Sequence, residues 1–465
     1  MNFERPNISD NLIVESWDLE DREVFFVLDP DKPSWAFINK DSLEILNLCN
    51  GKNAILDISK KIAEKYLIDQ KEALNTVKSF LNNMAEIKVV HYNGTEGESQ
   101  VPTSGNSFRS MAIEITKKCN LRCVHCFLSA GSAAEVELTT EEIKELMRSA
   151  KELGAKSVSI GGGEPLMRPD CIDLIKYALS IDLLVALGTN GTLIDEKTSE
   201  YLSKLPIKIQ ISLDGARKET HDYIRGEGSY DLTMKGLNNL VEKGMLKDIV
   251  IAFTPMSRNV EEIPEIIDFA LEKGIHVIQF PPLSSSGRAK SNWPELMLND
   301  DKMIWFWDYV SKRSTELKGR LDLLAECFSL DINNLGSPNR CSIGSQLRIS
   351  PTGDVYPCQC FHFGDEYCIG NVRNENLGAI ISSQKLGEIL NECYIRPLKI
   401  ESCVGCKWKN FCGAGCMGSA FETNGTVWST DSCNIRRDWI ESLFKKKFND
   451  FYGLDFDLNQ SQKES

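Results

Sequence analysis

Between residues 109 and 290, short apolar runs alternate with segments whose apolar residues recur every three or four positions. The runs predict buried strands, and the segments between them, such as Thr140–Leu153 and Val260–Lys273, predict amphipathic helices. This alternation is typical of a parallel sheet, so we expect an α/β fold in this part of the chain. The expected strands are Ala112–Ile115, Ser157–Ile160, Leu183–Leu187, Ile207–Ile211, Ile249–Phe253 and His276–Phe280.

Residues 1–92 have a different pattern and predict a domain of their own. Glu23–Leu28 and Ser34–Asn39 read as a hairpin that closes at Asp29–Pro33, because prolines and aspartates favour a turn. Three helical segments follow, and Ile87–Val90 reads as a last strand. We therefore expect a small winged-helix domain.

The remaining chain divides by composition. Residues 93–108 are polar and rich in glycine and serine, which predicts a linker. Residues 291–338 read as a connector, 339–440 as a cysteine-rich domain, and 441–465 as a C-terminal helix and tail.

Charge and composition exclude several classes of protein. The net charge is −14, and residues 1–92 hold eleven basic against sixteen acidic residues, so we expect neither a nucleic-acid nor an anionic-membrane partner. The first ten residues lack the features of a signal peptide, and no apolar run is long enough to span a membrane. We expect a cytoplasmic protein, in which sixteen cysteines favour metal ligation over disulfides.

Cys119, Cys123 and Cys126 form a Cys-x3-Cys-x2-Cys group just after the first predicted barrel strand. Because strand ends are where α/β folds bind ligands, this loop is the first candidate site. A four-iron four-sulfur cluster normally takes four thiolates. Three would leave one iron open to a small molecule.

At these residues the sequence resembles the radical S-adenosylmethionine (SAM) superfamily, with His125 where the family usually has an aromatic residue. The resemblance implies a partial (β/α)6 barrel in which SAM chelates the open iron and is cleaved to methionine and a 5′-deoxyadenosyl radical. In that setting the three cysteines are both metal ligands and catalytic residues.

Polar and glycine residues at later strand ends match positions that contact SAM in that family. The glycine pair and the carboxylate after the second strand resemble the segment that holds the SAM amino group. Ser212 and Asp214, after the fourth strand, match positions that contact the SAM ribose and the rim of the active site. Arg225 resembles the arginine that pairs with the SAM carboxylate. Ordinary turn or loop roles are the alternatives. The matching residues are Gly162, Gly163, Glu164, Ser212, Asp214 and Arg225.

The cysteines after residue 340 follow the order of the SPASM extension of radical SAM enzymes. By resemblance, this extension binds two auxiliary four-iron clusters, for a total of three. The first would be held by Cys341, Cys358 and Cys416, and the second by Cys403, Cys406, Cys412 and Cys433.

Two questions about these cysteines stay open. A tetrathiolate zinc site is the rival for the second group, since closely paired cysteines also suit zinc. The first cluster has either a fourth ligand, with Cys360 and Cys368 as candidates, or an open iron that binds a substrate thiolate. Cys393 falls on an apolar helical pattern and is expected to be a plain buried residue.

The order of the three units resembles maturases of ribosomally made peptides. The first unit resembles their leader-recognition (PqqD-like) domains, in which a leader adds a strand to a sheet edge. The closest resemblance is to sactipeptide and ranthipeptide synthases, which join a cysteine sulfur to a carbon of an acceptor residue. It implies a leader-bearing precursor peptide and a reductant such as flavodoxin or ferredoxin as partners. A different peptide or protein modification, namely a carbon–carbon crosslink or a side-chain oxidation, is the alternative. A non-catalytic iron–sulfur scaffold is a third possibility, against which Glu164, Arg225 and the three-cysteine loop argue.

Overall fold

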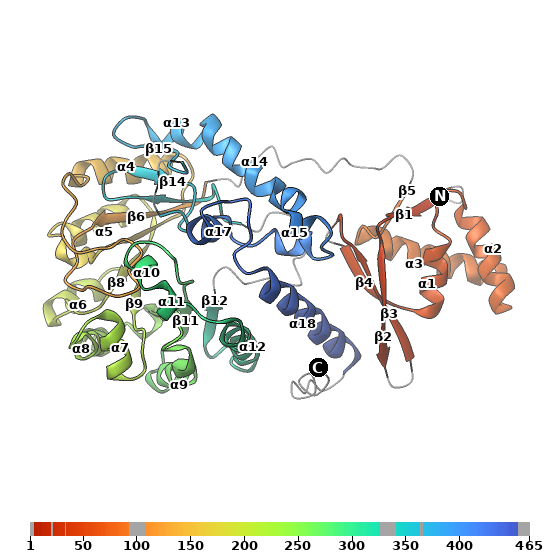
Figure 1. The fold of residues 1–465 in the computed structure, drawn as a ribbon, viewed down its shortest axis with the longest axis horizontal. Helices are drawn as coiled ribbons and strands as arrows, with labels where there is room; N and C mark the ends of the chain where they lie inside the picture. Colours follow the sequence, from red (N-terminus) through yellow and green to blue (C-terminus); the bar gives the residue numbers. More distant parts are fainter. Residues whose placement is uncertain are drawn as a thin grey trace.

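The computed structural model describes residues 4–19, 22–32, 34–92, 108–325, 341–362, 364 and 366–453. Nearly all of the expected linker, Cys327 and the chain end after residue 453 lie outside these ranges. Figure 1 shows an N-terminal unit at one end of the molecule, a large α/β unit at the other, and α18 (Cys433–Tyr452) between them.

The N-terminal unit contains an antiparallel sheet in the order β2-β3-β4, three helices, and a separate pair of short strands. The hairpin and the three helices are confirmed. The elements are β1 (Pro6–Ile8), β2 (Ile13–Leu19), β3 (Arg22–Asp29), β4 (Ser34–Asn39), α1 (Lys40–Asn47), α2 (Ile55–Tyr66), α3 (Gln70–Glu86) and β5 (Val90–Tyr92).

Two details of this unit differ from the prediction. β1 and β2 were not expected. The last strand begins at Val90 rather than Ile87, because Ile87 ends α3 and Lys88 turns the chain with a φ of 63°. β5 then pairs with β1, and this pairing brings the start of the chain beside the end of the unit.

The α/β unit contains the six predicted parallel strands, in sequence order, as neighbours in one open sheet. Its ten strands run in the order β12-β11-β10-β9-β8-β7-β6-β13-β14-β15. The expected barrel strands are β6 (Ser110–Thr116), β7 (Ser157–Gly162), β8 (Leu184–Thr189), β9 (Ile207–Ser212), β10 (Ile249–Ala252) and β11 (Val277–Phe280).

Amphipathic helices connect these strands and pack their apolar faces on the sheet. In the first of them, Thr139 and Glu142 form a capping box, and Ile143, Leu146 and Met147 are buried. The helices are α4 (Thr140–Glu152), α5 (Cys171–Ser180), α6 (Glu196–Ser203), α7 (Lys218–Arg225), α8 (Ser229–Glu242) and α9 (Ile263–Lys273). Short 3-10 helices lie at Pro165–Met167, Leu246–Asp248 and Val260–Glu262.

The expected connector, 291–338, contains more structure than predicted. It supplies a long helix and β12, an edge strand that pairs parallel with β11. The connection is formed by α10 (Arg288–Ser291), α11 (Trp293–Leu296), α12 (Asp300–Glu316) and β12 (Asp322–Ala325).

The cysteine-rich region continues the barrel sheet through β13, which pairs parallel with β6. α18 begins at Cys433, well before the residue at which a C-terminal helix was expected. The elements are β13 (Gln346–Ile349), β14 (Asp354–Tyr356), β15 (Gly370–Asn371), α13 (Leu377–Ile381), α14 (Gln384–Lys399), α15 (Glu401–Val404), α16 (Lys409–Cys412), α17 (Met417–Asn424) and α18. Among the described residues, no helix is both long and apolar enough to cross a membrane.

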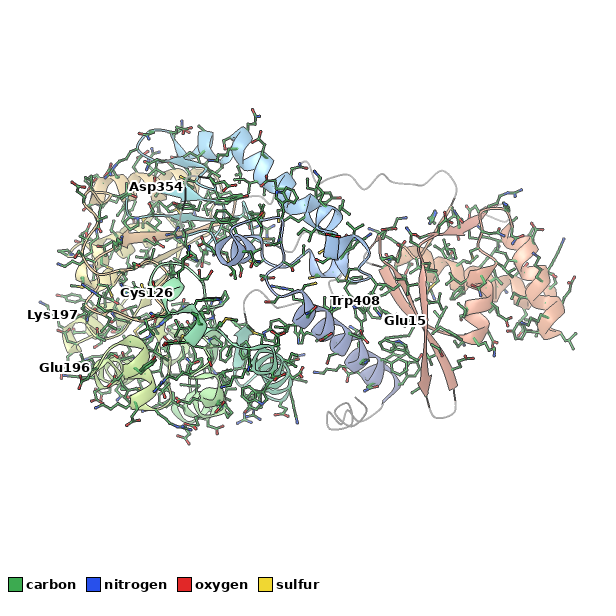
Figure 2. All side chains as sticks on the ribbon, in the orientation of Figure 1. Glu15, Cys126, Glu196, Lys197, Asp354 and Trp408 are labelled. Carbon is green, nitrogen blue, oxygen red and sulfur yellow. The ribbon has the colours of Figure 1, made fainter. Side chains whose placement is uncertain are left out.

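An aromatic interface joins the N-terminal sheet to the cysteine-rich region. Its buried members are Phe26, Leu28, Trp408, Phe411, Ile440 and Phe444. Ion pairs flank it: Lys407 Nζ lies 2.6 Å from Glu15 Oε1, and Lys409 Nζ lies 2.7 Å from Asp31 Oδ1. Figure 2 shows Glu15 and Trp408 at this junction. The N-terminal unit is therefore packed against the rest of the chain through an apolar contact with a polar rim.

Candidate functional site

The three-cysteine loop follows β6 and is held by its own backbone. The Cys119 amide donates to Gly131 O at 2.9 Å. The amide of Ala130 donates to the Cys126 sulfur at 3.4 Å. Cys123 is buried, whereas Cys119 and Cys126 are half-buried. The three thiols are therefore held in place by the loop and are partly shielded from water.

Burial makes the Cys119 and Cys123 thiols poor acids when they are considered alone. It raises the pKa of Cys123 to about 11 and raises the pKa of Cys119 as well. The three sulfurs also act on one another electrostatically, so they lie close together. A thiolate in such a place needs a nearby positive charge, and bound iron supplies one. The donor set fits an iron–sulfur cluster.

A buried ion pair lies beside this loop. Arg225 Nε donates to Asp214 Oδ2 at 2.7 Å, and another guanidinium nitrogen lies 4.0 Å from the Cys123 sulfur. Burial by itself would raise the pKa of Asp214, but the charge of Arg225 and then that of His125 lower it overall. Arg225 therefore links Asp214 to the cysteine loop. One edge of the Arg225 guanidinium is already hydrogen-bonded to Asp214.

His125 and Ser212 complete this side of the site. His125 Nε2 lies 3.4 Å from Asp214 Oδ2, and burial lowers the pKa of His125 to about 4, so its ring is neutral near pH 7. Ser212 ends β9 next to Ala252 of β10 and is half-buried. Asp214, at the end of the fourth strand, thus meets the three-cysteine loop.

The glycine pair after β7 packs directly on the backbone that leads to Cys119. A Cβ at Gly162, whose φ is 131°, would lie 2.4 Å from Thr116 O, and one at Gly163 would lie 2.2 Å from Lys118 O. The Gly163 amide donates to Thr116 O at 2.7 Å. Only glycine allows this approach at both positions, which fixes the turn against the cysteine loop.

Glu164 is fully buried and is held by donors from the protein. Its Oε1 accepts from Thr189 Oγ1 at 2.7 Å and from Leu166 N at 3.1 Å, and its Oε2 accepts from Asn190 N at 2.8 Å. A carboxylate has about four acceptor positions, so one is left over. Burial raises the pKa of Glu164 in spite of these bonds. Thr189 and Asn190, which had no predicted role, therefore orient this carboxylate.

Arg288 is a site residue that the sequence did not reveal. Its Nε donates to Cys123 O at 2.9 Å and its Nη1 donates to Ala130 O at 2.8 Å. These two hydrogen bonds hold the backbone of the cysteine loop in place. The preceding Gly287 would place a Cβ 2.3 Å from Phe127 O. Arg288 lies after the last predicted strand, where no motif marked it.

The first C-terminal cysteine group lies on the barrel side of the cysteine-rich region. Cys358 and Cys416 are close enough to Cys341 to act on it electrostatically, so the three predicted ligands come together. A buried ion pair ties this region to the barrel: Arg348 of β13 contacts both Glu114 oxygens, at 2.8 and 2.9 Å.

The second group, Cys403, Cys406, Cys412 and Cys433, also comes together. The charges of Cys406 and Cys433 help to raise the pKa of Cys403, and the charge of Cys403 helps to raise the pKa of Cys412, so these thiols lie near one another. Across the described residues, no three Cys, His, Asp or Glu side chains converge tightly enough to hold a single metal ion. By chemistry alone, four thiolates suit either a four-iron four-sulfur cluster or zinc.

An aromatic contact joins the barrel loop to the segment that follows Cys358. Phe127, next to Cys126, lies with its ring centroid 4.3 Å from that of His362. His362 is two residues beyond Cys360. In Figure 2, Cys126 lies within the α/β unit and Trp408, near the second group, lies toward the N-terminal unit.

Three family models match the chain. The radical SAM superfamily matches residues 113–270, an iron–sulfur cluster-binding domain called SPASM matches 341–407, and coenzyme PQQ synthesis protein D (PqqD) matches 25–90. Each match falls on one of the units described above.

Relatives and solved structures agree with these matches. Mycofactocin maturase MftC of Mycobacterium tuberculosis is 33% identical over 314 residues, which cover 67% of this chain and 78% of that protein. Fe-coproporphyrin III synthase of Methanosarcina barkeri is 30% identical and covers 70% of this chain and 88% of its own.

Among solved structures, Streptococcus suis SuiB bound to precursor peptide SuiA has a TM-score of 0.57 at 18% identity, covering 92% of this chain and 98% of its own. At this identity the likeness shows the fold. The relatives, the fold and the thiol groups agree: the chain belongs to the radical SAM superfamily, with a PqqD-type unit before its barrel and a SPASM extension after it.

Proposed function

We propose that this enzyme forms thioether crosslinks in a ribosomally made precursor peptide, from a cysteine sulfur to a carbon of an acceptor residue. The observation that carries the peptide as substrate is the N-terminal unit. It is a PqqD-type unit with an edge strand beside a pocket, packed against the cysteine-rich region. Support also comes from the name of the relative MftC, a maturase, and from the SuiB structure, whose title names a bound precursor peptide.

The N-terminal unit offers a docking place for an extended leader. Among the described residues, β4 is an edge of the three-stranded sheet, so its outer backbone groups can pair with an added strand. A pocket of 390 Å³ beside the end of β4 is lined by apolar residues, among them Phe37, Phe80 and Met84, by Tyr452 from α18, and by the polar Glu23, Asn39 and Ser42. The strand would give main-chain affinity, and this pocket of mixed polarity would select a side chain.

The radical SAM and SPASM units imply SAM and iron–sulfur clusters as cofactors. We assign the SAM-binding cluster to the barrel cysteines. We assign the two auxiliary clusters to the two C-terminal groups, which gives three clusters. When bound, the first cluster and SAM supply a carbon radical that removes hydrogen from an unactivated carbon.

The chain's own residues position SAM in this proposal. The glycine turn at Gly162 and Gly163 offers backbone close to the open side of the cysteine loop, and Glu164 retains one acceptor position for an ammonium. Arg225 remains partly available to a carboxylate beside its bond to Asp214. Ser212 lies at the neighbouring strand end, where a ribose hydroxyl would bind.

The electron balance explains why further clusters are useful. Thioether formation removes two hydrogen atoms from the peptide: one is transferred as an atom to the adenosyl carbon, and the other leaves as a proton and an electron. That electron needs an acceptor, and a flavodoxin or ferredoxin would supply the electron that starts each turnover. The contact between Phe127 and His362 brings the barrel loop next to the first auxiliary group, which is suited to receive it.

The experiment compares two variants of the full chain. Phe80→Arg places a charge in the pocket, whereas Leu67→Arg places the same charge at a side chain of the same unit that is 91% exposed. We expect Phe80→Arg to weaken binding of the leader-bearing precursor by about 30-fold or more, as for a central anchor. Leu67→Arg should bind normally, and both should cleave SAM normally with a reductant. Equal precursor modification by both variants at low peptide concentration would contradict leader binding at this pocket.

A further inference from the structure

α14 brings a fourth thiol to the first C-terminal cysteine group. Cys393 lies on the buried face of this helix and is 7% exposed. The Cys341 and Cys393 thiols are hydrogen-bonded to each other, and Cys393 also interacts electrostatically with Cys416. Cys393 lies in the same buried core as Cys358, and Cys341 packs against that core. Cys341 also interacts electrostatically with Cys358. Cys393 therefore belongs to the same cluster of thiols as the three predicted ligands.

A buried arginine fixes α14 to the loop that carries Cys416. Arg396 follows Cys393 by three residues, so both lie on one face of the helix. Its guanidinium is fully buried and donates to four backbone carbonyls. The acceptors are Ala414 at 3.1 Å, Gly415 at 3.0 Å, Val427 at 2.7 Å and Ser429 at 2.7 Å. Two of these residues immediately precede Cys416, so the clamp holds the two cysteines at a fixed separation.

Packing one turn earlier on α14 fixes the helix to the loops of Cys341 and Cys358. Gly344 has a φ of 78°, and a Cβ there would lie 3.0 Å from Leu390 Cδ2 of α14. The Gly344 amide donates to Pro357 O at 2.8 Å, next to Cys358. Two separate sets of contacts therefore hold the helix, and each places Cys393 toward the same three thiols.

We propose that Cys393 is the fourth thiolate ligand of the first auxiliary cluster. The proposal rests on the cluster assignment of the proposed function. Cys368 is engaged elsewhere, because its thiol donates to Gly370 O at 3.3 Å. Cys360 lies against Gly418 of α17, two residues from Cys416, and is the alternative ligand that the variants below test.

This ligand set has a consequence for the reaction. A cluster held by four thiolates has no iron left for a substrate sulfur. The first auxiliary cluster then transfers electrons and does not bind the cysteine of the peptide, so that cysteine must be held by the protein or by another group.

The test uses the full chain with all three barrel cysteines replaced by alanine, so that only auxiliary clusters contribute. After anaerobic reconstitution we expect about eight iron per chain, four for each cluster. The electron paramagnetic resonance spectrum of the reduced protein should not change when a small thiol such as 2-mercaptoethanol is added. A shift on thiol addition would show an open iron and overturn the proposal. An iron content near four with stoichiometric zinc would instead reject the cluster assignment itself.

Variants in the same background identify the ligand. With Cys393→Ala we expect a spectrum that shifts on thiol addition, and loss of about one iron per chain on mild oxidation, since an unligated iron is released first. Cys393→Ser should keep the iron but alter the spectrum. Cys360→Ala and Cys368→Ala are the matched controls and should behave as the parent. An open-iron response in either control, with none in Cys393→Ala, would overturn the proposal. If Cys393→Ala does not fold, Cys393→Ser still decides it, because an unchanged spectrum in that variant would overturn the proposal.

Discussion

Replacing Phe444 by alanine tests how firmly the N-terminal unit is held. Phe444 lies on α18, is fully buried, and stacks on Trp408 with ring centroids 5.0 Å apart. Its ring also lies 5.1 Å from that of Phe26 and 5.1 Å from that of Trp35. It therefore touches the N-terminal sheet on one side and the cysteine-rich region on the other.

The size of the effect follows from these contacts. Truncating a buried phenylalanine costs about 3–5 kcal/mol. All of the partner rings lie across the interface or beside it, so most of this loss should fall on docking. At about 1.4 kcal/mol per factor of ten, the population of undocked molecules should rise by roughly 100- to 4,000-fold.

Hydrogen exchange followed by mass spectrometry under anaerobic conditions measures this opening. We expect amides in the second half of α18 to exchange much faster in Phe444→Ala, while those of the barrel strands do not change. Phe451→Ala is the control, because Phe451 lies on the same helix and is 71% exposed. Unchanged exchange in Phe444→Ala, or an equal increase in both variants, would refute the reasoning.

Three further predictions concern the cluster sites. Gly163→Ala should sharply reduce 5′-deoxyadenosine formation, because its Cβ would lie 2.2 Å from Lys118 O, whereas Gly161→Ala, with nothing within 4 Å, should be nearly normal. Arg396→Met should lose about 3 kcal/mol or more of local stability and lower the iron content, because four backbone carbonyls, two of them buried, lose their donor. Arg437→Met, which loses a single exposed bond to Asn434, should keep normal iron. Replacing the three barrel cysteines should abolish SAM cleavage yet leave the auxiliary clusters bound; continued 5′-deoxyadenosine formation would contradict the barrel assignment.

The barrel could be predicted because its strands are buried on both faces and its helices are amphipathic. Each strand therefore reads as an apolar run between periodic segments, and all six were found. β2 was missed because its apolar residues Ile13 and Trp17 pack against the aromatic interface, whose other half lies about 400 residues away. β13 was missed because it joins the sheet beside β6, which lies far from it in the sequence. β12, which follows β11, was missed because it is short and only Leu323 of its four residues is buried.

For the sites as well, features that depend on local sequence could be predicted, whereas features that depend on tertiary packing could not. Cysteine spacing is a local signal, so the predicted thiol groups could be read from the sequence. Thr189 and Asn190 act through Glu164, and Arg288 acts through backbone carbonyls, which carry no sequence signal. Cys393 read as an ordinary helix residue, because its place beside Cys341 depends on how α14 packs.

The central claim, radical crosslinking of a peptide, is tested most directly by the mass of the product. The enzyme is co-expressed with the leader-bearing peptide encoded beside its gene, and the peptide is analysed by high-resolution mass spectrometry with fragmentation. The account predicts a loss of two hydrogen atoms per crosslink, with fragmentation that places each link between a cysteine and an acceptor residue. The loss should be absent when the three barrel cysteines are alanine. An unmodified peptide in the presence of active, SAM-cleaving enzyme would contradict the claim, and a loss of two hydrogens that leaves every cysteine thiol free would replace the thioether with a carbon–carbon crosslink or an oxidation.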